Sequence, residues 1–191
     1  MQGNADRIMA KERITILDKT FELTIPEAQI QEAVRNVAER IRQDYEDKDP
    51  VFVVVLNGAF VFAADLFRMM QFPYTMAFTK LTSYQGVSST GKIIEQLAVS
   101  EDITGRHVVI VEDIVETGYS MEFLKERLME KHPASIEICA FSYKPDKVKV
   151  PGLEVKYVGM TLPEAFIVGY GLDYNQHGRQ MRDIFSLIHN S

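Results

Sequence analysis

The chain has 191 residues, of which 46% are hydrophobic and 25% are charged, and this balance is typical of a globular domain with a sizeable core. The formal net charge of −6 gives no support for nucleic-acid binding, and no apolar run approaches the roughly 20 residues of a membrane span. The N-terminus lacks the pattern of a secretory signal, and the single cysteine, Cys139, excludes an intramolecular disulfide. We therefore expect a cytoplasmic protein without a nucleic-acid or membrane partner.

The apolar pattern predicts strands that alternate with helices. Residues 51–56 and 107–111 are continuous apolar runs, which are typical of parallel strands buried on both faces. In chain order we expect strands over 14–25 with a turn at 18–19, a helix from 26 to 45–48, a strand over 51–56, a helix over 59–70, strands over 74–81, 93–99 and 107–111, a helix over 119–131, and strands over 136–141, 154–158, 166–168 and 184–189.

This order indicates an α/β fold, with a mainly parallel central sheet flanked by helices. Right-handed crossovers then place a ligand at the C-terminal ends of the strands. We expect one domain over residues 1–191, with residues 1–12 as a flexible arm. Residues 83–91 are small and polar, and they predict a mobile loop.

The stretch HVVIVEDIVETGYSM is the most informative part of the chain. A buried strand runs into Glu112 and Asp113, and three residues later Thr117, Gly118 and Ser120 open a helix. Glycine lets a ligand approach the backbone, and the amides of a helix N-terminus bind phosphate. Carboxylates accept hydrogen bonds from sugar hydroxyls. The residues predict a site for a phosphorylated sugar, although ordinary strand and helix caps would give the same pattern.

This stretch resembles the phosphoribosyl-pyrophosphate motif of type I phosphoribosyltransferases, in which an acid pair and two apolar residues precede Asp-Thr-Gly. Further segments are similar to hypoxanthine phosphoribosyltransferases: residues 56–60 and 64–66 to the pyrophosphate loop and its helix, 83–84 to the flexible lid, 144–145 to the purine-recognition lysine, and 166–174 with Arg179 to the base-binding signature. The resemblance covers residues 25–189. It implies the type I phosphoribosyltransferase fold, with a small hood lobe formed by the N- and C-terminal segments.

The resemblance also implies the reaction. A magnesium-dependent enzyme of purine salvage would transfer the 5-phosphoribosyl group from phosphoribosyl pyrophosphate to hypoxanthine, and to guanine, giving IMP or GMP and pyrophosphate. Its partners would be these small molecules, and the chain would form a homo-dimer or homo-tetramer. A cis peptide bond between Leu56 and Asn57 is implied as well.

Each matched residue has an implied role. Phosphoribosyl pyrophosphate would be bound by Leu56, Asn57, Gly58, Glu112, Asp113, Thr117, Gly118, Tyr119, Ser120 and Arg179. The purine would be bound by Lys144, Phe166, Ile167 and Asp173, beneath a lid that contains Ser83 and Tyr84. Mg²⁺, which prefers oxygen ligands, would be held by Glu112, Asp113 and Asp173. Taken alone, Lys144 would be a surface lysine, Phe166 a core residue and Asp173 a turn residue.

The chain departs from the family pattern at three positions. Glu116 stands where the family has an aspartate that takes the proton of the purine imidazole nitrogen. The carboxylate keeps this chemistry possible with a different reach, and we expect Glu116 to be the catalytic base. Asn57 replaces a lysine or arginine, and Tyr119 replaces a lysine or small polar residue. Both changes would weaken binding of phosphoribosyl pyrophosphate without changing the reaction type.

Other functions remain open at this point. An RNA-binding regulatory protein could share the fold, but the acidic net charge disfavours it. A phosphoribosyltransferase for xanthine and guanine, or for adenine, is a second alternative, and Lys144 disfavours adenine because adenine has no 6-oxo group. A nucleotide-binding module without turnover would result if Glu116 cannot act as a base.

Overall fold

The computed structural model describes residues 12–84, 92–162 and 164–188, which form two β-sheets. The larger sheet has the strand order β5-β4-β3-β6-β7-β8, and the smaller sheet has the order β1-β2-β10-β9. The helices are α1 (Glu27–Tyr45), α2 (Phe60–Met69), α3 (Tyr119–Met129) and the 3-10 turn η1 (Pro145–Lys147). The strands are β1 (Arg13–Ile16), β2 (Lys19–Ile25), β3 (Val51–Leu56), β4 (Thr75–Tyr84), β5 (Lys92–Leu97), β6 (His107–Val115), β7 (Ser135–Tyr143), β8 (Tyr157–Met160), β9 (Ile167–Val168) and β10 (Ile184–Leu187).

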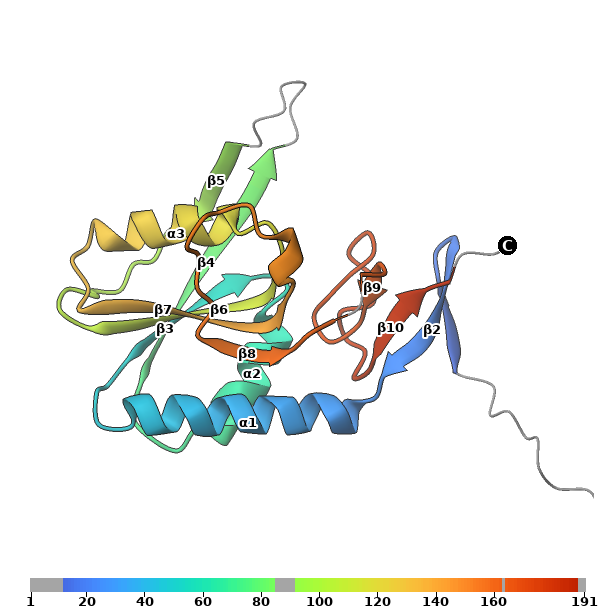
Figure 1. Ribbon diagram of the computed structural model, residues 1–191, viewed down its shortest axis with the longest axis horizontal. Coiled ribbons are helices and arrows are strands. Elements are labelled where there is room, and N and C mark those ends of the chain that lie inside the picture. The colour runs from blue at the N-terminus through green and yellow to red at the C-terminus, as the bar shows by residue number, and fades with distance from the viewer. Residues whose placement is uncertain (1–11, 85–91, 163, 189–191) are drawn as a thin grey trace, which may run out of the picture.

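The larger sheet confirms the predicted α/β architecture. Strands β4, β3, β6, β7 and β8 run parallel, and β5 pairs antiparallel with β4 at the edge. Figure 1 shows α3 on one face of this sheet and α1 on the other, with the smaller sheet to one side. None of the helices within the described residues is long and apolar enough to cross a membrane.

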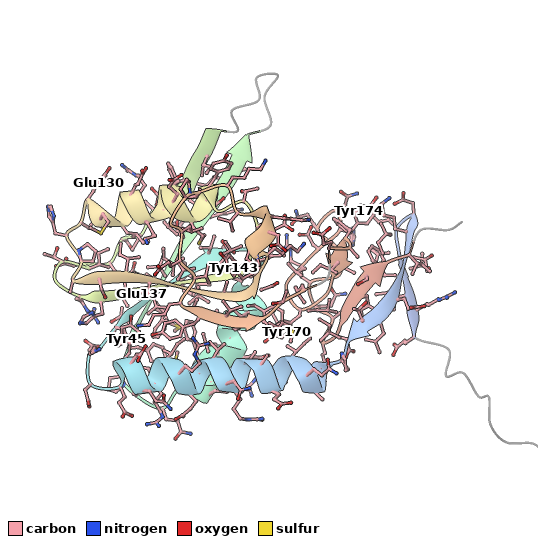
Figure 2. All side chains as sticks on the ribbon, viewed as in Figure 1. Tyr45, Glu130, Glu137, Tyr143, Tyr170 and Tyr174 are labelled. Carbon is pink, nitrogen blue, oxygen red and sulfur yellow. The ribbon has the colours of Figure 1, made fainter. Side chains whose placement is uncertain are left out.

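Strand β3 shows why its apolar run does not alternate. Phe52 and Val54 pack in the cluster beneath α1 and α2, whereas Val51 and Val53 pack in the cluster beneath α3. Figure 2 shows side chains filling the space on both faces of the sheet. Cys139 lies fully buried in the first cluster, as expected of a small hydrophobe, and this burial raises the pKa of its thiol.

Strand β6 is longer than the sequence predicted. Its ladder with β3 ends where Val111 pairs with Val54, but its ladder with β7 continues to Val115. The prediction that this strand ends at residue 111 was therefore wrong, because β6 still pairs with β7 after its pairing with β3 has ended. The acid pair lies inside the strand, beyond the last residue of β6 that pairs with β3.

The smaller sheet joins the two ends of the chain and is the predicted hood lobe. Strand β2 pairs antiparallel with β1 and β10, and β10 pairs antiparallel with β9. Its core contains Phe21, Val168 and Phe185. The segments predicted as strands at 166–168 and 184–189 therefore belong to the hood and not to the larger sheet.

Several element ends differ from the sequence prediction. Strand β4 continues to Tyr84, because its hairpin ladder with β5 pairs Ser83 with Ile93 and Tyr84 with Lys92. The predicted lid residues Ser83 and Tyr84 are therefore the last two residues of strand β4. Residues 85–91 of the expected loop, and residues 1–11 of the expected arm, lie outside the described residues.

We predict that Phe62→Ala lowers the free energy of unfolding by about 3–5 kcal/mol, because Phe62 is fully buried beneath the sheet. Phe60→Ala on the same helix is the control, since Phe60 is 60% exposed, and it should change stability by no more than about 0.5 kcal/mol. Urea unfolding of the two variants measures both values. Equal losses would contradict the assignment of the core.

Candidate active site

The acid pair on β6 packs directly against the loop that follows β3. A Cβ atom built on Gly58 would lie 1.6 Å from Oδ2 of Asp113, so only glycine leaves room for this carboxylate. The peptide bond between Leu56 and Asn57 in the same loop is cis. Two of the predicted phosphoribosyl-pyrophosphate segments are therefore in contact, although about 55 residues separate them in the chain.

Glu112 is the buried member of the acid pair. Its side chain is 8% exposed, and its Oε1 accepts the backbone N–H of Asp113 at 2.9 Å. Burial, followed by the neighbouring charge of Asp113, raises the pKa of Glu112 well above its ordinary value. Asp113 itself accepts the backbone N–H of Ile114 through Oδ1 at 2.7 Å.

A cavity of about 220 Å³ lies between the end of β6 and the start of α3. It is lined by Glu112, Asp113, Ile114, Val115, Glu116, Thr117, Gly118, Ser120 and Met121. Gly118 has φ +86°, and a Cβ there would lie 2.6 Å from Leu153. The positive φ favours glycine at this position, where the chain turns into α3, and Thr117 and Ser120 on either side line the same small cavity.

A second cavity, of about 380 Å³, lies beside the first. It is lined by Ile114, Glu116, Lys144, Lys147, Glu164, Ala165, Phe166, Ile167, Leu172 and Asp173. Ile114 and Glu116 line both cavities. The predicted purine residues therefore surround one space, and the predicted base lies between it and the cavity of the predicted phosphate-binding residues.

The predicted base and the predicted recognition lysine are in contact. Lys144 Nζ lies 2.5 Å from Glu116 Oε1. The lysine side chain is 9% exposed, whereas the glutamate side chain is 43% exposed. A lysine buried this deeply on a binding wall, with a carboxylate as its partner, can donate to a polar atom of a ligand that enters the cavity.

The loop between β9 and β10, residues 169–183, is called the C-terminal loop here and carries the predicted residues Asp173 and Arg179. Asp173 forms an ion pair with Arg179 at 2.5 Å, and Arg179 also donates to the carbonyl oxygen of Gly171 at 2.7 Å. A Cβ on Gly171, whose φ is +94°, would lie 2.2 Å from the carbonyl oxygen of Gly58. The loop after β3 is therefore held between Asp113 on one strand and Gly171 on this loop.

Five predicted residues are not among the described residues that line either cavity: Leu56, Asn57, Gly58, Tyr119 and Arg179. Tyr119 begins α3 with 49% of its surface exposed. Phe166 lines the larger cavity with 48% exposure, and its ring centre lies 5.9 Å from that of Tyr174. The side chains of the predicted lid residues at 83 and 84 lie outside what the structure describes.

Two charged residues that were not predicted from the sequence, Lys147 and Glu164, also line the larger cavity. Lys147 lies on the 3-10 turn that follows Lys144, and Glu164 lies shortly before β9. Neither belongs to a motif. The one available signal for Lys147 was its spacing of three residues from Lys144, which places both near one turn.

The family model of the phosphoribosyl transferase domain matches residues 26–175. The hypoxanthine phosphoribosyltransferase of Salmonella typhimurium is 37% identical over 165 residues, which cover 85% of this chain and 92% of the relative. The hypoxanthine-guanine phosphoribosyltransferase of Mycobacterium tuberculosis is 35% identical over 166 residues, with 83% and 82% covered.

A solved structure agrees with these sequence matches. The hypoxanthine-guanine phosphoribosyltransferase of Bacillus anthracis superposes with a TM-score of 0.81 at 36% identity, covering 88% of this chain and 97% of that one. The chain therefore belongs to the phosphoribosyltransferase family, and it has the type I fold that the motif implied.

We predict that Glu112→Gln raises the free energy of unfolding near neutral pH. Because the folded state raises the pKa of Glu112, it binds this proton more tightly than the unfolded state, and stability is lost as the pH rises from about 4.5 toward the folded pKa. Glutamine keeps the oxygen that accepts the Asp113 N–H but does not titrate. The gain over wild type should therefore grow with pH, as measured by urea unfolding.

Glu39→Gln is the control for this pH series. Hydrogen bonds from Arg42 and then Gln43 lower the pKa of Glu39 to about 2, so its contribution to stability is lost only when the pH falls below about 4.5. Its difference from wild type should stay constant between about pH 5 and pH 8. A similarly flat difference for Glu112→Gln would contradict the raised pKa of Glu112.

Proposed function

We propose that the chain is a hypoxanthine phosphoribosyltransferase of purine salvage. It transfers the 5-phosphoribosyl group from phosphoribosyl pyrophosphate to hypoxanthine, and to guanine, with release of pyrophosphate. The observation that carries this proposal is that Glu116 lines both the phosphate cavity and the cavity with Lys144. A bond between a ribose carbon and a purine nitrogen must form where two such sites meet, and the names of the relatives support the same reaction.

The smaller cavity suits the phosphoribosyl group. Thr117, Gly118 and Ser120 offer amides and hydroxyls to the 5-phosphate. Glu112 and Asp113 accept hydrogen bonds from the ribose hydroxyls. The bond to pyrophosphate breaks through a transition state with oxocarbenium character, in which positive charge develops on the ribose. The carboxylates beside the ribose stabilise this charge.

The larger cavity suits a 6-oxopurine. Lys144 donates a hydrogen bond to the 6-oxo group, and Glu116 accepts the proton of one imidazole nitrogen as the other, unprotonated imidazole nitrogen attacks the ribose. Phe166 lies against the ring face, and the backbone of Ile167 meets the ring edge. Because Lys144 and Glu116 are 2.5 Å apart, an entering base must separate them. It offers each of them a new partner, an acceptor for the lysine and a donor for the glutamate.

The carboxylates also fit a magnesium ion. Among the described residues no group of three or more His, Cys, Asp or Glu side chains could hold a metal by itself. Magnesium typically takes one or two carboxylates together with substrate phosphates and water, which matches Glu112 and Asp113 on β6 and Asp173 on the C-terminal loop. When bound, the ion would neutralise charge on the leaving pyrophosphate. Arg179, which now pairs with Asp173, supplies a cation from the same loop.

The other functions considered from the sequence receive less support. The relatives are named for hypoxanthine or for hypoxanthine and guanine, and this favours these bases over xanthine or adenine. The same names disfavour an RNA-binding regulator and a module without turnover. We also propose that the whole chain forms one phosphoribosyltransferase domain and that it works in the cytoplasm, as its single buried cysteine suits.

We further propose that the chain forms a homo-oligomer through the apolar face of β4 and β5. This face exposes Met76, Phe78, Ile94 and Leu97, each with 41–46% of its surface accessible. Alternation along β4 and its register with β5 place the four side chains on one side of the sheet. It is the face that α1 and α2 cover further along the sheet, so a second copy would continue the same core.

We predict that Phe78→Lys lowers the oligomeric state measured by size-exclusion chromatography with light scattering. A charge in the middle of an apolar contact must be desolvated without a partner, which opposes association. Met129→Lys is the control, because Met129 is 55% exposed but lies on α3. A change of mass in the control alone, or in neither variant, would contradict the proposed surface.

We predict that purified protein with magnesium and phosphoribosyl pyrophosphate forms nucleotides from hypoxanthine and guanine but not from adenine. Glu116→Gln should lower kcat by about 10²–10⁴, because the amide cannot take the imidazole proton. Nucleotide formation followed by absorbance measures these rates. Turnover of adenine, or no turnover of any base, would contradict the proposed reaction.

We predict that Lys144→Gln raises KM for hypoxanthine by about 10- to 100-fold, since a hydrogen bond from a charged donor is lost. KM for phosphoribosyl pyrophosphate should stay within about threefold of wild type. Lys147→Gln is the matched control, because Lys147 lines the same cavity without contacting Glu116 in the described residues. An equal rise in both variants would argue against a specific role of Lys144.

A further inference from the structure

The C-terminal loop has an unusual backbone. Gly169, Tyr170 and Gly171 all have positive φ, at 101°, 47° and 94°. Glycine tolerates this region, but tyrosine does so at a cost, and such a conformation persists only where surrounding contacts fix it. The contacts made by Tyr170 therefore hold this loop in its conformation.

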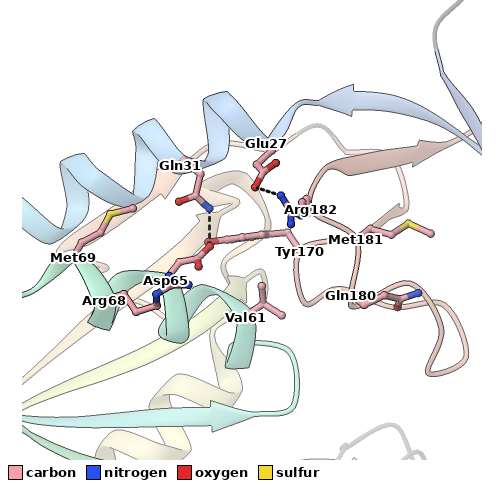
Figure 3. A pocket seen from close by; sticks show the side chains of 10 residues that line it. All are labelled: Glu27, Gln31, Val61, Asp65, Arg68, Met69, Tyr170, Gln180, Met181 and Arg182. Atoms are coloured by element: carbon pink, nitrogen blue, oxygen red, sulfur yellow. Dashed lines mark hydrogen bonds and ion pairs between the residues drawn. The ribbon is translucent and has the colours of Figure 1, made fainter.

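Tyr170 reaches away from its loop and ends on α2. Its side chain is 2% exposed, and its hydroxyl donates to Oδ2 of Asp65 at 3.0 Å. Gln31 on α1 donates to the same oxygen at 2.6 Å. Figure 3 shows these residues on one wall of a pocket of about 610 Å³, with Tyr170 extending from the C-terminal loop toward both helices. The tyrosine ring is also packed against Phe141, with 4.8 Å between ring centres.

The two ends of this contact carry the two halves of the proposed pyrophosphate site. Asp65 lies on α2, the helix that begins directly after the loop containing Asn57 and Gly58. Tyr170 precedes Gly171, which touches the carbonyl oxygen of Gly58, and the same loop continues to Asp173. The hydrogen bond thus joins α2, which follows the loop after β3, to the C-terminal loop. Neither Tyr170 nor Asp65 is among the described residues that line the two proposed substrate cavities.

We propose that Tyr170 and Asp65 are positioning residues for phosphoribosyl pyrophosphate: their hydrogen bond fixes the distance between the loop after β3 and the loop of Asp173. Neither residue touches substrate in this arrangement. The proposal rests on the proposed function, since it assigns pyrophosphate to these two loops. It predicts a larger effect on phosphoribosyl pyrophosphate than on the purine, because Lys144 and Glu116, the proposed hydrogen-bond partners of the purine, belong to other segments, although Phe166 and Ile167 lie near Tyr170 in the chain.

Tyr170→Phe tests the proposal with little damage to the fold. The ring packing remains, and Asp65 keeps Gln31 as a hydrogen-bond partner, so no buried carboxylate is left unpaired. We expect KM for phosphoribosyl pyrophosphate, and its Kd from calorimetry, to rise roughly 3- to 10-fold. The kcat and the KM for hypoxanthine should stay within about twofold of wild type.

Tyr157→Phe is a matched control in the same chain. Tyr157 is 1% exposed and donates to Asp44 at 2.5 Å, and Asp44 keeps Lys156 as a partner at 2.9 Å. Its ring lies 6.3 Å from that of Tyr45, which Figure 2 shows at the other end of α1 from Tyr170. This variant removes the same chemical group from the same kind of contact, so it should lower Tm by a similar amount without changing either KM.

Asp65→Asn completes a double-mutant cycle with Tyr170→Phe. If the two residues act as one unit, the Kd of the double variant for phosphoribosyl pyrophosphate should equal the higher Kd of the two single variants. If they act independently, the two fold-increases in Kd should multiply. Unchanged affinity for phosphoribosyl pyrophosphate in Tyr170→Phe, an equal effect in Tyr157→Phe, or an equal rise in KM for hypoxanthine would overturn the proposal. Calorimetry measures binding of phosphoribosyl pyrophosphate without turnover. A wild-type protein that binds this compound but turns over no base would contradict the proposed function, whereas unchanged binding in Tyr170→Phe would overturn the positioning role alone.

Discussion

The site depends on one steric constraint, which is the absence of a side chain at Gly58. Asp113 from β6 occupies the space where a Cβ would lie, and Gly171 from the C-terminal loop touches the carbonyl oxygen of the same residue. Three segments distant in the sequence can therefore meet at the end of β3. Atoms this closely packed leave little freedom for the carboxylate and the two loops, and such rigidity is what a site needs to hold a multiply charged substrate.

The fold produces this meeting point through the unequal lengths of its strands. The ladder between β3 and β6 ends at Val111, while β6 continues along β7 to Val115. The loop after β3 packs against β6 beyond this ladder, and the end of β6 leads into the cavity proposed to bind the 5-phosphate. The hood lies on the other side of the site. Phe166 directly precedes β9, β9 pairs with β10, and β10 pairs with β2.

Much of this arrangement could be predicted from the sequence. The continuous apolar runs of β3 and β6 predicted the parallel sheet, and the residues around Gly118 predicted a binding site at the start of α3, where the structure has a cavity. Contacts between distant segments could not be predicted in this way. Neither the packing of Gly58 against Gly171 nor the hydrogen bond from Tyr170 to Asp65 has a local signal, because each depends on how the helices and loops pack in three dimensions. The extension of β6 was missed for the same reason, since its hydrogen-bond partner is another strand.

In the proposed reaction Glu116 and Lys144, which contact each other in the free protein, separate and bind opposite groups of one purine. A crystal structure of the protein with its nucleotide product would show whether they separate. We expect Lys144 Nζ within hydrogen-bond distance of the 6-oxo oxygen, and the Glu116 carboxyl group within the same reach of the imidazole nitrogen that does not carry the ribose. A complex in which the two side chains stay paired, with the base elsewhere, would exclude these roles.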